Sequence, residues 1–298
     1  MIINQQNLQA LFTGFKAAFN TGFRTSEIYW PKVATMVPSS TTIELYAWLG
    51  QFPRLREWIG DRVIKSMAAH NYSLKNLPFE STLGVDRDNI EDDSYGIFNP
   101  MFAEMGYSAA THPDELIFAL IAAGFTTLCY DGQYFFDTDH PVINSDGEIS
   151  SVSNVHTAAG GNPWYLLDTR RPLKPLIFQK RREYAFTSMV TMQDEAVFMR
   201  KEYRYGVDAR VNVGFGFWQQ AFGSQEQLVP AAFNDAYDSM LGFKSDEGRP
   251  LGIMPNLLVC GPTNREYANE CIKAERLANG ASNTNRDLVD VMVVPWLP

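Results

Sequence analysis

Cysteine is scarce in this sequence: its 298 residues include three, Cys129, Cys260 and Cys271, at a spacing that matches no metal-binding or redox motif. Such a pattern is typical of buried, reduced thiols in a protein made in a cytoplasm. Basic residues are also few, with 25 Lys and Arg against 34 Asp and Glu, for a formal net charge of −9. Because no basic cluster accompanies this charge, the chain lacks the surface of a classical duplex-DNA reader.

Long hydrophobic runs and signal-like segments are missing as well. The best apolar run, residues 116–125, has about half of the roughly 20 residues that a membrane-spanning helix needs, so we expect no membrane association. The first basic residue is Lys16, which leads us to expect no secretory signal. In contrast, 45% of the residues are hydrophobic, which predicts a folded chain of one large domain or two smaller ones.

Motifs of common enzymes are also absent, since the sequence contains no G-x-S-x-G, Walker loop, H-E-x-x-H or G-x-G-x-x-G. One short stretch could carry chemistry, because Asp137, Asp139 and His140, with Asp131 nearby, offer carboxylate and imidazole ligands. Two interpretations stay open: a metal-dependent hydrolytic site, or a turn in which the aspartates accept backbone N–H groups. We predict no cofactor.

The first 40 residues predict a helix followed by an extended arm. Gly22 is expected to end the helix. Residues 25–40 contain Pro31 and Pro38 and show no period, which favours an extended conformation. The apolar residues that share one face of the helix are Leu8, Leu11, Phe12, Phe15 and Phe19.

The next segment has two strand-like stretches around a charged middle. Apolar and other residues alternate over 43–49, and a second strand-like stretch covers 72–85. Together they predict a long projecting hairpin over 50–85. The hairpin is either an ordinary solvent-exposed extension of the chain or an arm that packs on a neighbouring subunit. The second alternative is open because exposed strand edges pair readily.

Residues 86–124 predict one long bent helix or two abutting helices that end at Gly124. Asp88 and Glu91 have the spacing of a capping box. Glu91, Asp92 and Asp93 would then lie in a first turn, where carboxylates complement the helix dipole.

The remainder of the chain shows a polar segment, an alternating segment and then a mixture of helix and strand patterns. Residues 137–163 are polar and without a period, which predicts a mobile or binding loop. Residues 203–217 alternate strictly and predict a long strand. A small α/β layer is expected at the end, with a helix over 230–241, a strand over 257–260, a helix from a Thr263–Glu266 capping box to Gly280, and a strand over 288–294.

Several short motifs occur in order over nearly the whole chain. They are WLGQFP (48–53), LREWIG (55–60), IEDD (90–93), HPDEL (112–116), DG (131–132), FFDTDHP (135–141), WYLL (164–167), YGVDAR (205–210), GFW (216–218) and GRPL (248–251). As a set, these motifs closely resemble those of the major head subunits of Mu-like bacteriophages and prophages. No single motif would be specific, but the whole series is.

The resemblance implies an α+β chain with the Hong Kong 97 type capsid fold. That fold combines an N-terminal arm, an extended β-hairpin loop, a peripheral domain with a long spine helix, and an axial α/β domain. In this sequence the parts would be the arm at 1–40, the loop at 50–85, the peripheral domain at 41–49, 86–124 and 173–219, and the axial domain at 125–172 and 220–298.

It also implies a structural protein rather than an enzyme. The expected function is a major capsid protein that self-assembles into hexamers and pentamers of an icosahedral head around double-stranded DNA. The chain would be a virion component, made and assembled in the bacterial host cytoplasm. Expected partners are further copies of itself, a scaffold or protease, a portal, decoration proteins, and packaged DNA bound without sequence specificity. The alternatives are the shell protein of a capsid-like nanocompartment and the hydrolase that uses Asp137, Asp139 and His140.

If the chain is such a subunit, charged groups are candidates for contacts between subunits. Basic residues of the loop would meet acidic groups of an adjacent subunit, among them the carboxylates of the IEDD motif. The candidates on the loop are Arg54, Arg56, Glu57, Arg62 and Lys65, and those of the motif are Glu91, Asp92 and Asp93.

Overall fold

The computed structural model of the chain describes residues 4–49, 72–92, 94–144, 146–191, 193–277 and 279–298. The helices are α1 (Gln5–Thr25), α2 (Trp30–Val33), α3 (Arg87–Glu91), α4 (Asn99–Ala122), α5 (Glu195–Arg200), α6 (Pro230–Leu241) and α7 (Arg265–Ile272). The 3-10 turns are η1 (Ser94–Phe98), η2 (Ala123–Phe125), η3 (Trp218–Gln220), η4 (Asp246–Gly248) and η5 (Pro262–Asn264). The strands are β1 (Ala34–Pro38), β2 (Ile43–Leu45), β3 (Ser73–Lys75), β4 (Leu77–Asp86), β5 (His140–Ile143), β6 (Ile149–Val152), β7 (Val155–Ala159), β8 (Trp164–Leu167), β9 (Leu176–Met189), β10 (Glu202–Phe215), β11 (Ala221–Gln225), β12 (Leu257–Cys260) and β13 (Asp290–Val293).

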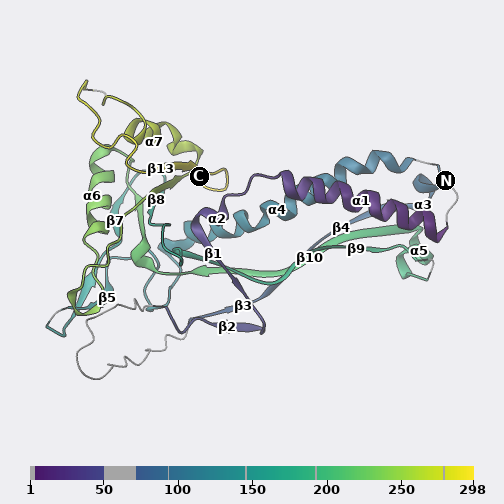
Figure 1. Cartoon of the computed structure of the whole chain (residues 1–298), viewed down its shortest axis with the longest axis horizontal. Helices are drawn as coiled ribbons and strands as arrows, with labels where there is room; N and C mark the ends of the chain where they lie inside the picture. Colours follow the sequence, from purple (N-terminus) through teal and green to yellow (C-terminus); the bar gives the residue numbers. More distant parts are fainter. Residues whose placement is uncertain (1–3, 50–71, 93, 145, 192, 278) are drawn as a thin grey trace.

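The chain has an elongated part joined to a more compact part (Figure 1). In the elongated part, α1 and α4 lie along a sheet with the strand order β1-β9-β10-β4. The compact part contains α6, α7 and a sheet with the order β13-β12-β8-β11-β7. Helix α1 begins at the free end of the elongated part, whereas the C-terminus lies near the junction (Figure 1). This mixture of helices and largely antiparallel sheets confirms the predicted α+β class.

The sheet of the elongated part is built around two long strands. β10 pairs antiparallel with both β9 and β4, and β1 pairs parallel with β9. The alternation predicted for 203–217 is confirmed, because the odd-numbered residues of β10 from Tyr203 to Val211 are buried. The extended conformation predicted for 25–40 is wrong at Pro31, which lies at the start of α2. It is right for β1, which is extended and forms a strand of this sheet.

Helix α1 packs along α4 through its predicted apolar face, of which Phe15 and Phe19 are almost completely buried. The helix does not end at Gly22 but continues to Thr25. A Cβ atom at Gly22 would lie 1.9 Å from the carbonyl oxygen of Ala103 on α4. Gly22 therefore serves the close approach of two helices and is not a helix stop.

The predicted capping box at Asp88 and Glu91 is wrong. The side chain of Asp86 caps α3 by accepting the N–H of Asp88 at 2.8 Å. Because Asp86 is the last residue of β4, its pairing with β10 sets where this short helix can begin. Glu91 and Asp92 then lie at the end of α3, and the long helix α4 starts later, at Asn99.

The strand predicted over 43–49 is shorter than expected. β2 stops at Leu45, and the chain then turns so that Tyr46 and Leu49 are buried. The Tyr46 hydroxyl donates to Oε1 of Gln179 on β9 at 2.7 Å, a contact that the local alternation could not predict. Residues 50–71 of the predicted hairpin lie outside the described residues, whereas β3 and β4 confirm its strands over 72–85.

In the compact part, the predicted helix over 230–241 and the strand over 257–260 are confirmed, and β13 lies within the strand predicted over 288–294. The Thr263–Glu266 capping box is wrong, since α7 has no side-chain cap. Its first flanking residue, Asn264, instead donates from its amide to the Asn162 carbonyl at 2.9 Å. The helix also ends at Ile272, well before Gly280, because Arg276 and Ser282 pair in a turn.

The segment 137–163 was predicted to lack regular structure, and that prediction is wrong. It contains β5, β6 and β7, which are too short and polar to show a clear period. Asn154 is fully buried between them, and its Nδ2 donates to the Phe135 carbonyl at 2.8 Å. Tertiary hydrogen bonds thus order a segment whose local sequence gives no signal.

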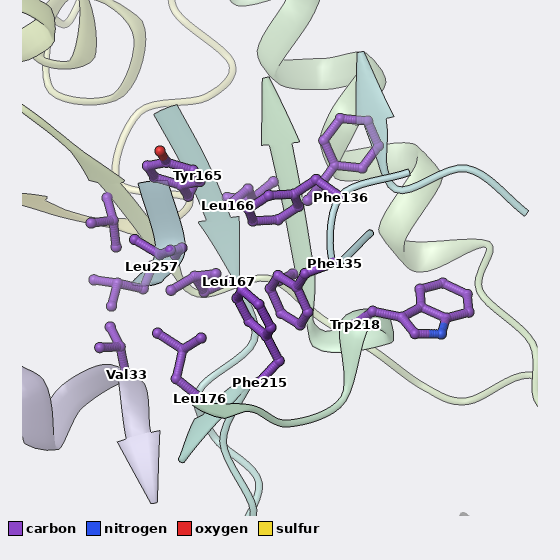
Figure 2. Packing of buried hydrophobic residues seen from close by; sticks show 14 of the residues in the cluster. Val33, Phe135, Phe136, Tyr165, Leu166, Leu167, Leu176, Phe215, Trp218 and Leu257 are labelled. Carbon is purple, nitrogen blue, oxygen red and sulfur yellow. The ribbon is translucent and has the colours of Figure 1, made fainter. Parts of the chain in front are cut away.

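Buried apolar residues form two clusters. The larger one fills the compact part and extends to the base of the elongated part, where Phe135 stacks on Phe215 with ring centroids 4.3 Å apart (Figure 2). The smaller one lies between α1, α4 and the long strands. All three cysteines are buried and free, as predicted. No helix in the described ranges combines the length and the apolar character needed to cross a membrane.

Candidate subunit-contact surfaces

The acidic candidates that the structure describes lie at the free end of the elongated part, around α3 (Figure 1). Glu91 accepts a hydrogen bond from Nε of Arg87 at 2.9 Å, and Asp92 is exposed at the end of the helix. Asp88 lies 3.5 Å from Nζ of Lys201. Candidates outside the described residues are Arg54, Arg56, Glu57, Arg62, Lys65 and Asp93.

Large apolar side chains are exposed on several separate surfaces. Phe198 and Met199 on α5, in the connection between β9 and β10, are 79% and 70% exposed. Ile97 on η1 and Ile149 on β6 are 67% and 76% exposed. The sequence alone indicates no role for these residues, because none belongs to a long amphipathic pattern. Exposed apolar groups of this size are typical of surfaces that another protein covers.

The stretch proposed for hydrolysis is built as a turn. Asp137 accepts the backbone N–H groups of Tyr134 at 3.0 Å and Thr138 at 2.7 Å. Asp139 accepts the Thr138 hydroxyl at 3.2 Å. The hydrogen bond of His140 Nδ1 is with Asp131 and not with Asp137 or Asp139. The three residues therefore do not converge as a set of metal ligands.

His140 instead forms a buried ion pair. Its Nδ1 donates to Oδ2 of Asp131 at 2.7 Å, and its Nε2 lies 3.2 Å from Oδ1 of Asn154. That oxygen also accepts the N–H of Asp137 at 2.9 Å, so it is an acceptor for the ring as well. Both ring nitrogens therefore face acceptor oxygens. The ring also stacks on Trp218 with centroids 4.0 Å apart.

Cys129, Asp131 and His140 form the one group of potential metal ligands close to one another among the described residues. Their polar atoms are engaged with one another, since Sγ of Cys129 donates to Oδ1 of Asp131 at 3.1 Å. Burial raises the pKa of the Cys129 thiol far above its ordinary value. With their polar atoms so engaged, the three residues have the arrangement of a structural hydrogen-bond network.

The Asp131 carboxylate should make stability depend on pH. Burial opposes its ionisation, but the hydrogen bond and the charge of His140 outweigh burial, so the pKa of Asp131 is lowered. The unfolded chain then binds the proton more readily, and the stabilisation present above about pH 4 is lost as the pH falls below that value. We expect Asp131→Asn to cost about 3 kcal/mol at pH 7 and to flatten the decline in acid.

Urea unfolding between pH 3 and pH 7 checks this prediction. Asp287→Asn is the matched control, because the Lys273 ammonium lowers the pKa of Asp287 at an exposed site. The control should leave stability nearly unchanged, because solvent screens an exposed ion pair. An equally steep acid decline in Asp131→Asn and in the unmodified chain would contradict the role given to this ion pair.

The comparisons with known proteins decide what kind of molecule carries these surfaces. A family model described as Mu-like prophage major head subunit gpT matches residues 8–297. The chain belongs to this family. It is 41% identical to the major capsid protein of Escherichia phage Mu, with both chains covered completely. It is 40% identical to the Mu-like prophage FluMu major head subunit of Haemophilus influenzae, with 93% of this chain and 92% of the relative covered.

Solved structures agree with this assignment. A subunit of the bacteriophage JBD30 procapsid matches with a TM-score of 0.88 and 52% identity, over 99% of this chain and 100% of that one. A subunit of the JBD30 capsid matches with a TM-score of 0.79 and 38% identity, over 100% of both chains. These matches confirm the predicted Hong Kong 97 type capsid fold.

The family assignment also decides between the functional hypotheses. The chain is a structural major capsid protein of a Mu-like phage and a component of the virion, as the motif series implied. The prediction that it is not an enzyme is confirmed. The hydrolase alternative is wrong, since Asp137 and Asp139 build a turn and His140 pairs with Asp131.

Proposed function

We propose that this major capsid protein self-assembles into hexamers and pentamers that close into an icosahedral head around double-stranded DNA. The observation that carries the proposal is the full-length similarity to a JBD30 procapsid subunit, with a TM-score of 0.88. Head-to-tail contacts between identical subunits form a ring when the rotation between neighbours closes. Rings of six and of five subunits together are one way to close a shell.

The exposed apolar residues support such contacts. A lone subunit would leave Phe198, Met199 and Ile149 in water, each more than two thirds exposed. They lie on elements far apart in the fold, α5 and β6, so one partner could not cover them all (Figure 1). Several neighbours around each subunit, as in a shell, would do so.

The proposed division into an arm, a loop and two domains is supported by the smaller apolar cluster. Its members come from 1–40, 50–85, 86–124 and 173–219, and none comes from the proposed axial segments 125–172 and 220–298. The larger cluster joins the base of the proposed peripheral domain to the axial segments, so the two domains would share a continuous apolar core at their junction. Within the proposed loop, residues 77–85 pair with β10 as part of β4, and Leu74 on β3 is buried in the larger cluster.

Further partners follow from the same function. We propose a scaffold or protease, a portal and decoration proteins, with assembly in the bacterial host cytoplasm. A JBD30 capsid is described as decorated with minor capsid protein trimers, which supports decoration of this shell. The net charge of −9 would keep packaged DNA from adhering tightly to the wall, since like charges repel at close range.

Purified protein in negative-stain electron microscopy tests the shell proposal. Closed shells, or rings and tubes of the same subunit contacts, are the expected result. A homogeneous small oligomer under all conditions tried, including coexpression with its phage's other head genes, would overturn it.

Arg56→Glu is expected to reduce the yield of assembled shells strongly while leaving the subunit folded. The reason is that reversal turns an attraction between the loop and carboxylates such as Asp92 of a neighbour into a repulsion, repeated at every copy in the shell. Each exposed pair contributes only about 0–1 kcal/mol, but the effect adds over many contacts. Sedimentation measures the assembled fraction, and circular dichroism measures folding.

Lys16→Glu is the matched control, because Lys16 is an exposed cation that belongs to α1 and not to the loop. Normal shells from Arg56→Glu would count against loop contacts of this kind. A restored yield on combining Arg56→Glu with Asp92→Arg would assign the partner directly.

A further inference from the structure

Three arginines of the long strands gather on one surface of the elongated part. Arg181 and Arg182 on β9 and Arg210 on β10, together with Ser39 and Ser40, line an open cavity of about 390 Å³. We call these five residues the arginine patch. Ser39 and Ser40 follow directly after β1, so the patch crosses neighbouring strands of the sheet.

Irregular pairing between β9 and β10 creates the patch. Arg210 is opposite Arg182, but the next residue, Val211, is opposite Lys180, so Arg181 has no partner across the ladder. A second shift between Asp208 and Arg210 places another extra residue on β9. Bulges of this kind re-aim side chains, and here they bring two consecutive arginines to one cavity. Regular alternation would have sent them to opposite faces of the sheet.

The charges in the patch are only partly balanced. Arg182 forms an ion pair with Asp208. No hydrogen bond or ion pair joins the guanidinium of Arg181 or Arg210 to another described residue, and Nη1 of Arg181 is buried without an acceptor. A buried donor of a charged group that lacks an acceptor is unfavourable. The isolated subunit therefore contains a cationic site whose guanidinium donors are available to an anion.

Carboxylates surround this site. Asp208 pairs with Arg182, Glu183 lies 2.7 Å from Nζ of Lys180, and Glu44 accepts the backbone N–H of Ser40 at 2.7 Å. A polyphosphate such as DNA would bring a row of negative charges against them. A single side-chain carboxylate fits between two guanidiniums without this repulsion, and arginine forks match its geometry.

We propose that the arginine patch binds a carboxylate side chain of a second copy of this chain. The proposal rests on the proposed assembly, which keeps other copies adjacent, and each copy carries 34 Asp and Glu against 25 Lys and Arg. Arg181 and Arg210 provide the charge, and the Ser40 hydroxyl provides a further donor, whereas the Ser39 hydroxyl already donates to Oε1 of Glu44 at 2.9 Å. The patch would be an intersubunit contact in addition to those proposed for the charged residues of the loop.

Charge reversal measures the contribution of the patch. Arg210→Glu should lower the assembled fraction at least tenfold, Arg210→Lys should retain most of it, and both subunits should keep the urea midpoint of the unmodified chain. Arg204→Glu is the matched control on the same strand, because Arg204 already has a partner in Glu202 at 3.3 Å. Equal assembly of Arg210→Glu and Arg204→Glu would overturn the proposal while the shells of the unmodified chain still supported the proposed function.

Zero-length carbodiimide cross-linking of Arg210→Lys shells identifies the occupant. The introduced amine should form an amide with an Asp or Glu of another copy, recognised by mass spectrometry in shells mixed from ¹⁴N and ¹⁵N subunits. Cross-links only within one copy, or none, would overturn the proposal. Weaker binding of a duplex DNA probe by Arg210→Glu with unchanged assembly would also overturn it and would assign the patch to phosphate.

Discussion

Replacing Gly106 by alanine is expected to lower the free energy of unfolding by about 3 kcal/mol. A Cβ atom at Gly106 would lie 2.0 Å from the carbonyl oxygen of Phe19 and 2.9 Å from the backbone nitrogen of Phe23. Both atoms belong to the backbone of α1, which cannot yield as a flexible side chain would. Alanine would therefore push α1 away from α4 and loosen the apolar cluster that Phe15 and Phe19 help to form.

Urea unfolding measures the loss, and amide exchange should show earlier opening of α1. Gly14→Ala is the matched control on α1, because Gly14 is exposed and an added Cβ atom there meets nothing within 4 Å. Alanine is the better helix former, so the control should gain about 0.5–1 kcal/mol. Similar stability of Gly106→Ala and Gly14→Ala would contradict the close crossing of the two helices.

Asp114→Ala is expected to cost about 2–4 kcal/mol through the loss of a long-range cap. Asp114 on α4 is completely buried, and its Oδ1 accepts the backbone N–H of Trp30 at 2.6 Å and that of Tyr29 at 3.1 Å. These groups lie at the start of α2, so one carboxyl group holds α2 and β1 against the long helix. Alanine would leave both donors without an acceptor.

Thermal and urea unfolding of Asp114→Ala measure this cost. Glu115→Ala is the matched control, since Glu115 is the next residue of α4 and is exposed. The control should change stability by at most about 0.5 kcal/mol. A small, equal effect of the two substitutions would contradict the capping role.

Asp114 also has a pH signature. Burial raises the pKa of Asp114 to about 6, although the amides of Trp30 and Tyr29 favour its charged form. Because this value lies above the ordinary one, ionising Asp114 is harder in the folded chain, and its contribution to stability declines as the pH rises from about 4 to 6. Asp114→Asn lacks this titration, so its deficit relative to the unmodified chain should shrink over that interval. A constant deficit would contradict the raised pKa.

The success of the predictions followed the length and regularity of each pattern. The strict alternation of β10 and the apolar face of α1 were predictable because each continues over ten or more residues and reports one buried side. Caps were not predictable, because the N–H group that Asp86 accepts depends on where β4 ends, and the Asn264 amide donates to the distant carbonyl of Asn162. The short strands β5 to β7 were missed because they are too short and polar to show a clear period.

The contact surfaces show the same limit. The motif series was enough to assign the family and to suggest charged contacts, because motif order is written along the chain. Arg181 and Arg182 were visible only as a pair of arginines, and nothing local connected them to Arg210. The bulges that bring the three together depend on how β9 pairs with β10.

The sequence by itself determined the class of the chain, the faces of its long elements and its kinship with head subunits, since periodicity and motif order are local or linear properties. Only the tertiary structure decided which groups meet: Gly106 against Phe19, Asp114 under Trp30, His140 between Asp131 and Trp218, and the arginine patch. The physical reason is that burial and hydrogen bonding reward contacts between residues many positions apart, and their partners are set by the packing of whole elements.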